Sequence, residues 1–411
     1  MRYLLFYISV YNFIFPIRLL AVPKFEWLIL SIPLIYVGLN FNKNKFFFQH
    51  KRYKTTLIYV LVLSLIGYVS SLIYMGDFIS VMVFMKFFLM IIIANSILIW
   101  GFNIYGENFI QKIFKILVIS ALIISITNIL EFFIPSFKAF LFKVIAVTGN
   151  SSYDISYRTH GFASGGGASL SLGILVLSLI SYFKYTISKN SISRIFYFIA
   201  FIFIYLSNII IGRTGLFLGA PIIIYLLVFK NLSIFNVFKK GLTLAILSFC
   251  IVSIISTIDE KLLNVLYKYG LEPIYNYVNY GTFQSKTTTG VLNMYFVPDI
   301  LHLFTGAGFW RWPTNGYPLP DPGYMKLLTS TGIFGFIIFY VYQFIIYFET
   351  FKFFKKRYNL KVLFFFLFSI LFIAEFKEAV FAQNYAFKVF ALLITFSWFN
   401  NNYNNLCHKK K

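Results

Sequence analysis

Three arginines of this sequence stand where they are able to bind an anion: Arg158, Arg213 and Arg311. The guanidinium group is a planar fork of donors, and it binds phosphate oxygens through two parallel hydrogen bonds. Each of the three lies in a polar segment between apolar stretches. We predict that Arg213 binds a phosphate and that Arg158 lies beside a second anion-binding segment. The alternative for Arg213 is that it anchors its turn among lipid headgroups.

A run of three glycines, Gly165, Gly166 and Gly167, begins the apolar helix that follows Arg158. Backbone N–H groups at the start of a helix attract negative charge, and glycine lets an anion approach them closely. His160 lies between Arg158 and the glycines, so we place it in the same candidate site. The other interpretation is that the glycines only make the start of the helix flexible.

Aromatic residues surround the third arginine, because Trp310 and Trp312 flank Arg311 and Tyr324 follows nearby. All four lie in the longest polar run of the chain, which extends from Asp259 to Met325. Such rings are suited to stacking on sugars, since they offer a flat apolar face beside a polar edge. An aromatic belt at the membrane interface is the alternative.

Several other chemistries are excluded by the motifs that the sequence lacks. It contains no pair of carboxylates separated by one residue, no phosphate-binding G-x-x-x-x-G-K, no H-E-x-x-H and no G-x-S-x-G. Its two cysteines, Cys250 and Cys407, have neither metal-site spacing nor a common depth for a disulfide. We therefore expect no metal, nucleotide or other cofactor.

The composition is that of an integral membrane protein. The 411 residues are 59% hydrophobic and 12% charged, whereas soluble domains carry about 25% charged residues. A membrane-spanning helix needs roughly 20 apolar residues. We predict one all-α membrane domain over 1–411, a polytopic bundle of about 12 spans. The predicted spans are 3–20, 25–40, 55–75, 78–100, 113–134, 165–183, 195–211, 215–229, 241–258, 325–348, 361–380 and 384–400.

The net charge of +23 comes mainly from lysines and arginines in short loops between the spans. They concentrate in 43–54, 184–194, 230–240 and 352–361, each after an even-numbered span. Cytoplasmic loops carry this excess, so we expect both termini to be cytoplasmic. Two loops then face outward: 135–164, with a helix in the membrane interface at 136–148, and the large loop 259–324. No basic face suited to nucleic acid exists outside these loops.

Four short motifs give the chain a resemblance to a known family. They are Tyr157-Arg158-x-x-Gly161-Phe162, Gly212-Arg213-Thr214-Gly215-Leu216, Gly306-x-Gly308 and Asp321-x-x-Tyr324-x-x-Leu327, the last followed by Gly332-x-x-Gly335. In order, spacing and side of the membrane the chain resembles the O-antigen polymerases of the Wzy type. These share a core with the O-antigen ligases, which corresponds here to 207–335.

The resemblance implies a metal-independent glycosyltransferase with a GT-C-like membrane core. Its substrates would be oligosaccharide repeat units linked to undecaprenyl diphosphate at the periplasmic face of the bacterial inner membrane. Arg213 and Arg158 would hold the diphosphate, with Arg311 as a third cation. Asp321 would accept the proton of the attacking hydroxyl or orient it. A flippase and a chain-length regulator of the same pathway are the implied partners.

Two alternatives remain open on the sequence. An O-antigen ligase would transfer finished polymer to the lipid A core, but the ligases commonly have a histidine at the position of Asp321. A flippase of lipid-linked oligosaccharides would do no chemistry, and it usually needs charged residues along a central cavity. Whether the product is O-antigen or capsule is not decided by the sequence.

Overall fold

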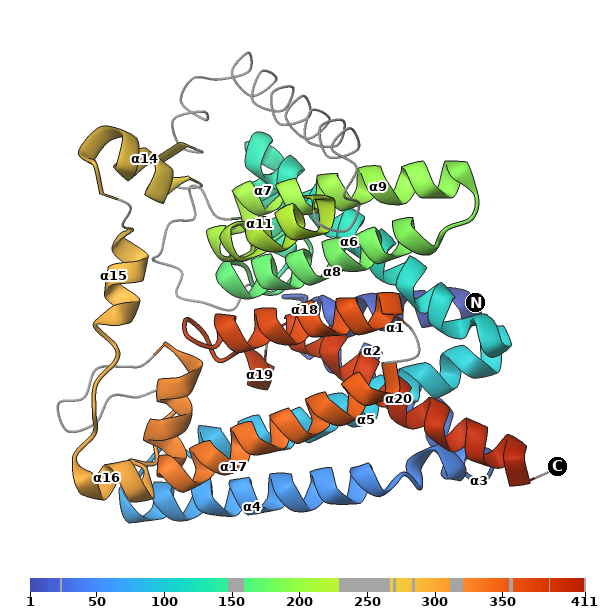
Figure 1. Ribbon diagram of the computed structural model, residues 1–411, viewed down its shortest axis with the longest axis horizontal. Helices are drawn as coiled ribbons and strands as arrows, with labels where there is room; N and C mark the ends of the chain where they lie inside the picture. The colour runs from blue at the N-terminus through green and yellow to red at the C-terminus, as the bar shows by residue number, and fades with distance from the viewer. Residues whose placement is uncertain are drawn as a thin grey trace. The chain divides into compact units, whose positions relative to one another are not determined.

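The computed structural model describes residues 1–22, 24–146, 159–228, 267–268, 271–282, 285–310, 321–354, 358–383 and 385–409. Most of these residues are helical, and the described chain forms no strand apart from an isolated bridge between Leu19 and Ile145 (Figure 1). The predicted all-α class is confirmed for the described residues. The chain divides into two compact units. Unit 1 contains Met1–Ile17, Val22–Leu117 and Thr289–Lys411, and unit 2 contains Arg18–Ala21 and Val118–Thr288.

Five helical stretches of the described chain are long and apolar enough to cross a membrane. They are Lys51–Ile73, Ile79–Phe133, Gly167–Ile187, Ser191–Ile211 and Gly323–Phe354. The second is divided by the turn Gly106–Asn108 into two helices. Shorter apolar helices lie at Phe25–Leu39, Arg213–Leu226, Leu360–Ala374 and Tyr385–Asn400. The protein is therefore membrane-embedded. The number of crossings stays a prediction, and the expected span 241–258 lies outside the described residues.

Unit 1 is built around three long helices with many aromatic contacts. These are α4 (Lys51–Ile73), α5 (Ile79–Tyr105) and α17 (Gly323–Phe354). Tyr59 of α4 stacks on Tyr342 of α17 with ring centroids 3.8 Å apart. Around them lie α1 (Arg2–Ile14), α2 (Phe25–Leu39), α3 (Phe41–Asn44), α16 (Ile300–Thr305), α18 (Tyr358–Ala374), α19 (Val380–Gln383) and α20 (Tyr385–Lys409). The helix α15 (Lys286–Leu292) precedes α16 in the chain.

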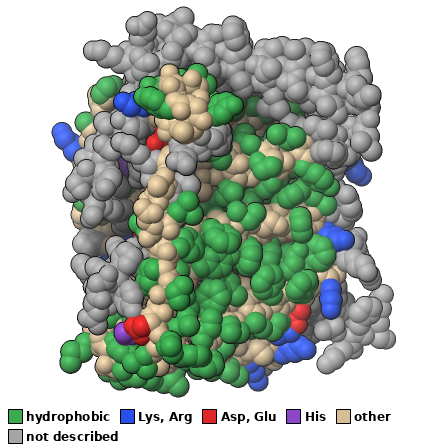
Figure 2. Space-filling view, turned by 60° about the vertical axis from the view of Figure 1, so that its left-hand side comes forward, with side chains coloured by type: hydrophobic (Ala, Val, Ile, Leu, Met, Phe, Trp, Pro, Cys, Tyr) green, Lys and Arg blue, Asp and Glu red, His purple; other side chains and the backbone are tan. Residues whose placement is uncertain are grey.

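Apolar side chains also cover the outer surface of this unit. On α17 the exposed residues recur every three or four positions: Phe334, Ile337, Val341, Ile345 and Phe348. Figure 2 shows hydrophobic side chains gathered over a broad area, with lysines and arginines along its margin. A stripe of this period on a helix that already has a buried face indicates contact with lipid.

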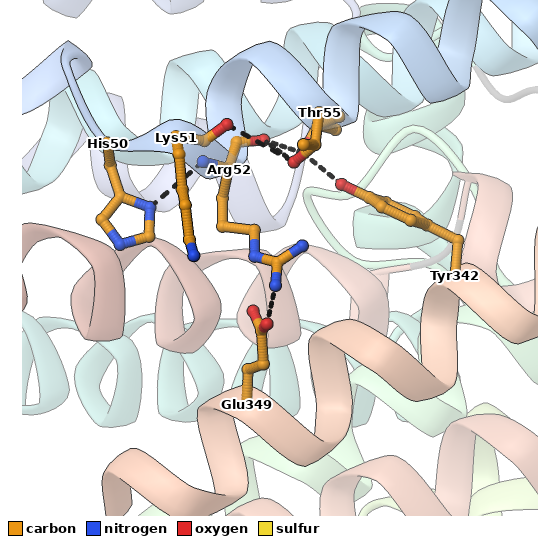
Figure 3. A network of polar contacts seen from close by, with 7 residues as sticks. His50, Lys51, Arg52, Thr55, Tyr342 and Glu349 are labelled. Atoms are coloured by element: carbon orange, nitrogen blue, oxygen red, sulfur yellow. Dashed lines mark hydrogen bonds and ion pairs between the residues drawn. The ribbon is translucent and has the colours of Figure 1, made fainter.

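The basic residues around α4 lie at the end of unit 1 where α4 begins, and they tie α4 to α17 there (Figure 3). Arg52 forms an ion pair with Glu349 of α17. The Thr56 hydroxyl lies 2.6 Å from the hydroxyl of Tyr342 and donates to the carbonyl of Arg52. His50 caps α4, since its Nδ1 accepts the N–H of Arg52 at 3.3 Å. The ring of His50 also stacks on Trp398 of α20.

At the opposite end, the turn between α4 and α5 holds the Gly306-Ala307-Gly308 segment. Both glycines have positive φ, 75° and 72°. A Cβ atom on Gly308 would lie 2.6 Å from the Cα of Ser71. The hydroxyl of Ser71 donates to the Gly308 carbonyl at 3.0 Å, and the N–H of Asp77 donates to the same carbonyl. The Gly306-x-Gly308 motif therefore has a packing role, because only glycine fits both the conformation and the contact.

The helix α17 is broken at Gly332, where φ is 66° and ψ is −174°. The sequence predicts a span over 325–348, and the structure instead begins the helix at Gly323 and interrupts it nine residues later at Gly332. The end of α16 packs against this break, since a Cβ on Gly332 would lie 2.2 Å from the carbonyl of Phe304. The N–H of Ala307 also donates to the carbonyl of Thr329 at 2.6 Å.

Unit 2 is built around α8 (Gly167–Ile187), whose residues are buried over most of its length. It packs against α9 (Ser191–Leu206), α10 (Asn208–Ile211) and α11 (Arg213–Val228). The unit also holds the C-terminal part of α6 (Phe109–Phe133), α7 (Pro135–Val144) and α14 (Glu272–Tyr280). The expected helix at 136–148 is present as α7. Its place in the membrane interface stays a prediction.

We expect Gly308→Ala to lower the melting temperature of the detergent-solubilised protein. Left-handed strain and the forced contact with Ser71 should together cost about 2–4 kcal/mol. Gly106→Ala is the matched control, since Gly106 has a φ of 58° but no atom within 4 Å of its added Cβ. Equal losses in the two variants would show that the contact with Ser71 carries no cost.

We also expect His50 to make stability depend on pH. Burial, together with Arg52 and Lys51, lowers the pKa of His50 to about 4. The unfolded chain takes up this proton near pH 6.5, so stability should fall as the pH drops from about 6.5 to 4. His50→Asn keeps a side-chain acceptor at the start of α4. It should reduce the dependence of the melting temperature on pH between about 6.5 and 4.

Candidate functional site

Two helices of unit 2 begin side by side, in parallel and in backbone contact. A Cβ on Gly212 would lie 2.9 Å from the carbonyl oxygen of Gly167, and one on Gly215 would lie 2.3 Å from that of Ser171. The hydroxyl of Ser171 joins the two helices, since it accepts the N–H of Gly215 at 2.7 Å and lies against the Gly212 carbonyl. The N-termini of α8 and α11 therefore meet, and their dipoles both favour an anion there.

Arg213 is the first residue of α11, so it lies where the two helices begin. The same place holds Gly165 and Gly166, which precede α8, and no side chain caps that helix. His160 lies close to Gly166, because a Cβ on Gly166 would be 3.6 Å from the Cβ of His160. The structure thus brings together four of the predicted site residues. Arg158 lies outside the described residues.

The guanidinium of Arg213 is paired with a carboxylate. Glu272, the first residue of α14, forms an ion pair and hydrogen bond with it. The side chains are 19% and 15% exposed, so both are mostly removed from solvent. The pair shows that the guanidinium of Arg213 binds a carboxylate in this structure. The sequence analysis does not identify Glu272, because its partner is 59 residues away in the chain.

A second carboxylate, that of Glu131, holds the segment before α8. Its Oε2 accepts the N–H groups of His160 and Gly161 at 2.9 and 2.7 Å. Gly161 has a φ of 56°, and a Cβ there would lie 2.5 Å from the hydroxyl of Thr127. Glu131 lies within the predicted span 113–134. Its signal in the sequence is a lone carboxylate near the end of an apolar stretch, which marks a functional candidate.

The predicted proton acceptor, Asp321, lies in unit 1 immediately before α17. Its side chain is 57% exposed, and the Nζ of Lys326 lies 3.9 Å away. The segment is fixed by Gly323, whose N–H donates to the carbonyl of Glu375 at 2.9 Å. Tyr324 is also held in place, since its hydroxyl donates to the carbonyl of Phe372 at 2.8 Å. An exposed carboxylate on a fixed segment is free to accept a proton from an incoming group.

Glu375 holds this segment through its backbone carbonyl. The sequence analysis does not identify it as a site residue. It follows α18 and is almost fully buried. Its carboxyl accepts the N–H groups of Val380 and Phe381 at 2.7 and 3.1 Å and the hydroxyl of Tyr340 at 3.1 Å.

The tryptophan cluster is described only in part. Trp310 is buried and its backbone N–H donates to the carboxylate of Asp77 at 3.0 Å. The same carboxylate accepts the N–H of Ile79 at the start of α5. The structure therefore gives Trp310 a packing role, with its ring edge-on to Phe84. Arg311 and Trp312 lie outside the described residues.

Within the described ranges, no three histidine, cysteine, aspartate or glutamate side chains converge as metal ligands do. The expectation of a reaction without a metal stays a prediction.

Comparison with protein-family models, with curated proteins and with solved structures finds no match to the chain.

Proposed function

We propose that the chain is a membrane glycosyltransferase that polymerises oligosaccharide repeat units carried on undecaprenyl diphosphate. The observation that carries the proposal is the meeting of the N-termini of α8 and α11 at Arg213. A diphosphate leaving group carries negative charge that increases as its bond to the sugar breaks. Two helix N-termini and a guanidinium are suited to stabilising that charge.

The reaction that fits is a displacement at the anomeric carbon of the donor. A hydroxyl oxygen of the acceptor glycan forms the new bond, and the bond from the sugar to the lipid diphosphate breaks. The hydroxyl proton passes to a base, and the diphosphate leaves with the bonding electrons. We assign the base to Asp321, whose side chain is exposed and anchored through Gly323. No outside energy source is needed, because the diphosphate is itself the activating group.

The remaining predicted residues keep supporting roles in this proposal. Arg158 and Arg311 are further diphosphate ligands, and Trp312 stacks on sugar together with Tyr324. In this proposal the protein lies in the bacterial inner membrane with both termini in the cytoplasm. The reaction takes place at the periplasmic face and belongs to lipopolysaccharide or capsule synthesis. A flippase supplies the lipid-linked repeats and a chain-length regulator acts on the product.

The test is the glycan profile of a strain that lacks this gene. Loss of the polymer ladder, leaving lipid A core capped by a single repeat, and its return with the wild-type gene would support a polymerase. Polymer that accumulates on undecaprenyl diphosphate while capped lipid A disappears would make the protein a ligase. A ladder unchanged by the deletion would contradict both.

In that strain we expect Arg213→Ala to give no ladder at a wild-type protein level in the membrane. Losing a charge-assisted contact to the leaving group should cost about 2–4 kcal/mol in the transition state. The matched control is Arg194→Ala, because Arg194 lies in the same unit on α9 and stacks on Tyr185. Wild-type chain lengths with Arg213→Ala would remove Arg213 from the site.

A further inference from the structure

Carbonyl groups at the end of α18 and in the turn after it hold the segment that begins α17. Gly323 and Tyr324 donate to two of them. The hydroxyl of Tyr295 donates to a third, that of Phe376, at 2.7 Å. The rings of Tyr324 and Phe376 also meet edge to face, with centroids 4.7 Å apart. The position of the segment that follows Asp321 therefore depends on the shape of this turn.

The carboxyl of Glu375 closes the turn. Its Oε2 accepts the N–H groups of Val380 and Phe381, five and six residues further along the chain. Both lie at the start of α19, and the first N–H groups of a helix need an acceptor from outside it. The Oε1 atom accepts the hydroxyl of Tyr340, which joins the turn to α17. Removing the carboxyl would take the acceptor from three buried donors, which is costly.

The same carboxyl lies directly against the backbone of Gly323. A Cβ on Gly323 would be 2.2 Å from Oε1 and 2.4 Å from Cδ of Glu375, and 2.8 Å from the Cα of Ala379. No side chain fits there while the carboxyl keeps its place. The glycine and the glutamate are therefore complementary, since the contact needs the missing side chain of one and the fixed carboxyl of the other.

The link from Gly323 to Asp321 is short and stiff. Only Pro322 separates the two residues, and it is buried. Proline fixes its own φ and restricts the residue before it to extended conformations. The side chain of Asp321 is 57% exposed, so its direction follows from the backbone more than from packing. A shift of Gly323 would therefore move the carboxylate of Asp321 with it.

We propose that Glu375 is a positioning residue for Asp321. Its carboxyl closes the turn 375–381 and, through Gly323, fixes the backbone that carries the Asp321 side chain. The catalytic consequence rests on the proposed function, in which Asp321 is the base. The fixing of the segment does not.

The first measurement is hydrogen exchange of the full-length protein in detergent micelles, followed by mass spectrometry. Peptides that cover 321–330 and 375–383 should exchange faster in Glu375→Ala than in the wild-type protein, while peptides from α4 should not change. The control is Glu349→Ala, which removes the ion pair with Arg52 near the other end of α17. It should leave 321–330 protected. Unchanged exchange of 321–330 in Glu375→Ala would overturn the proposal.

A double-mutant cycle tests the contact itself. Gly323→Ala should lower the melting temperature of the wild-type protein, because the added Cβ collides with the carboxyl of Glu375. In a Glu375→Ala background the same change should lower it by less, since the atoms nearest to the Cβ are gone. Residues in contact show this non-additivity, and distant ones do not. Additive losses would show that the carboxyl does not hold Gly323.

The third measurement is elongation by the purified protein of lipid-linked repeat units extracted from the strain that lacks the gene. Glu375→Ala should lower kcat about a hundredfold, as a small misplacement of a catalytic group does, and leave KM within about twofold. Glu375→Gln keeps an acceptor for the turn and should retain most of the activity, and Glu349→Ala should keep the wild-type kcat.

Two results of that assay would contradict the positioning role: a raised KM with unchanged kcat in Glu375→Ala, or equal losses in Glu375→Gln and Glu375→Ala. Failure of the proposed function has a different signature. The wild-type protein would then elongate nothing and deletion of the gene would leave the ladder intact, while the exchange and melting results would still decide whether Glu375 fixes the segment.

Discussion

The backbone contact between α8 and α11 is the constraint on which the candidate anion site depends. Gly212, just before α11, and Gly215 and Gly219 within it lie so close to their neighbours that a Cβ on any of them would overlap an atom of α8. Apolar helices in a membrane gain little from the hydrophobic effect between them, so small residues that permit close packing decide which helices associate. Here the association is parallel, and for that reason both positive dipole ends lie at Arg213. Larger residues would separate the helices and divide the site.

Unit 1 relies on a comparable contact, but the glycines are in a loop. Gly306 and Gly308 bring the chain against the end of α4, and the break at Gly332 leaves space for it. The helical backbone is interrupted within a helix long enough to span, which a membrane protein tolerates only where the freed groups find partners. The bond from Ala307 to Thr329 supplies one of them. Asp321 therefore lies just before a short helical piece, from Gly323 to Gly332, that these contacts anchor.

The sequence predicts the helices because a long apolar run with so little charge must satisfy its backbone polar groups internally, as a helix does. Arg213 and Asp321 are predicted outside the apolar stretches, since a charge within them would be costly. The sequence marks Glu131 only as a carboxylate near the end of an apolar stretch, and it does not reveal which groups Glu131, Glu272 or Glu375 contact. Each is a lone carboxylate in the sequence, and the groups that hold it are set by tertiary packing. The first span ends early, at Ile14 rather than near residue 20, because Pro16 cannot continue the helix.

The pairing of Arg213 with Glu272 makes the arrival of any anion an exchange. A newcomer must give the guanidinium as much as the ion pair that it replaces, less the hydration that the departing carboxylate regains in water. The headgroup of an ordinary acidic phospholipid carries a single negative charge and gains little from such a trade. A group with two or more charges gains from both helix ends as well as from the arginine. Under the proposed function, the carboxylate of Glu272 would therefore favour a diphosphate over the singly charged lipid headgroups around it.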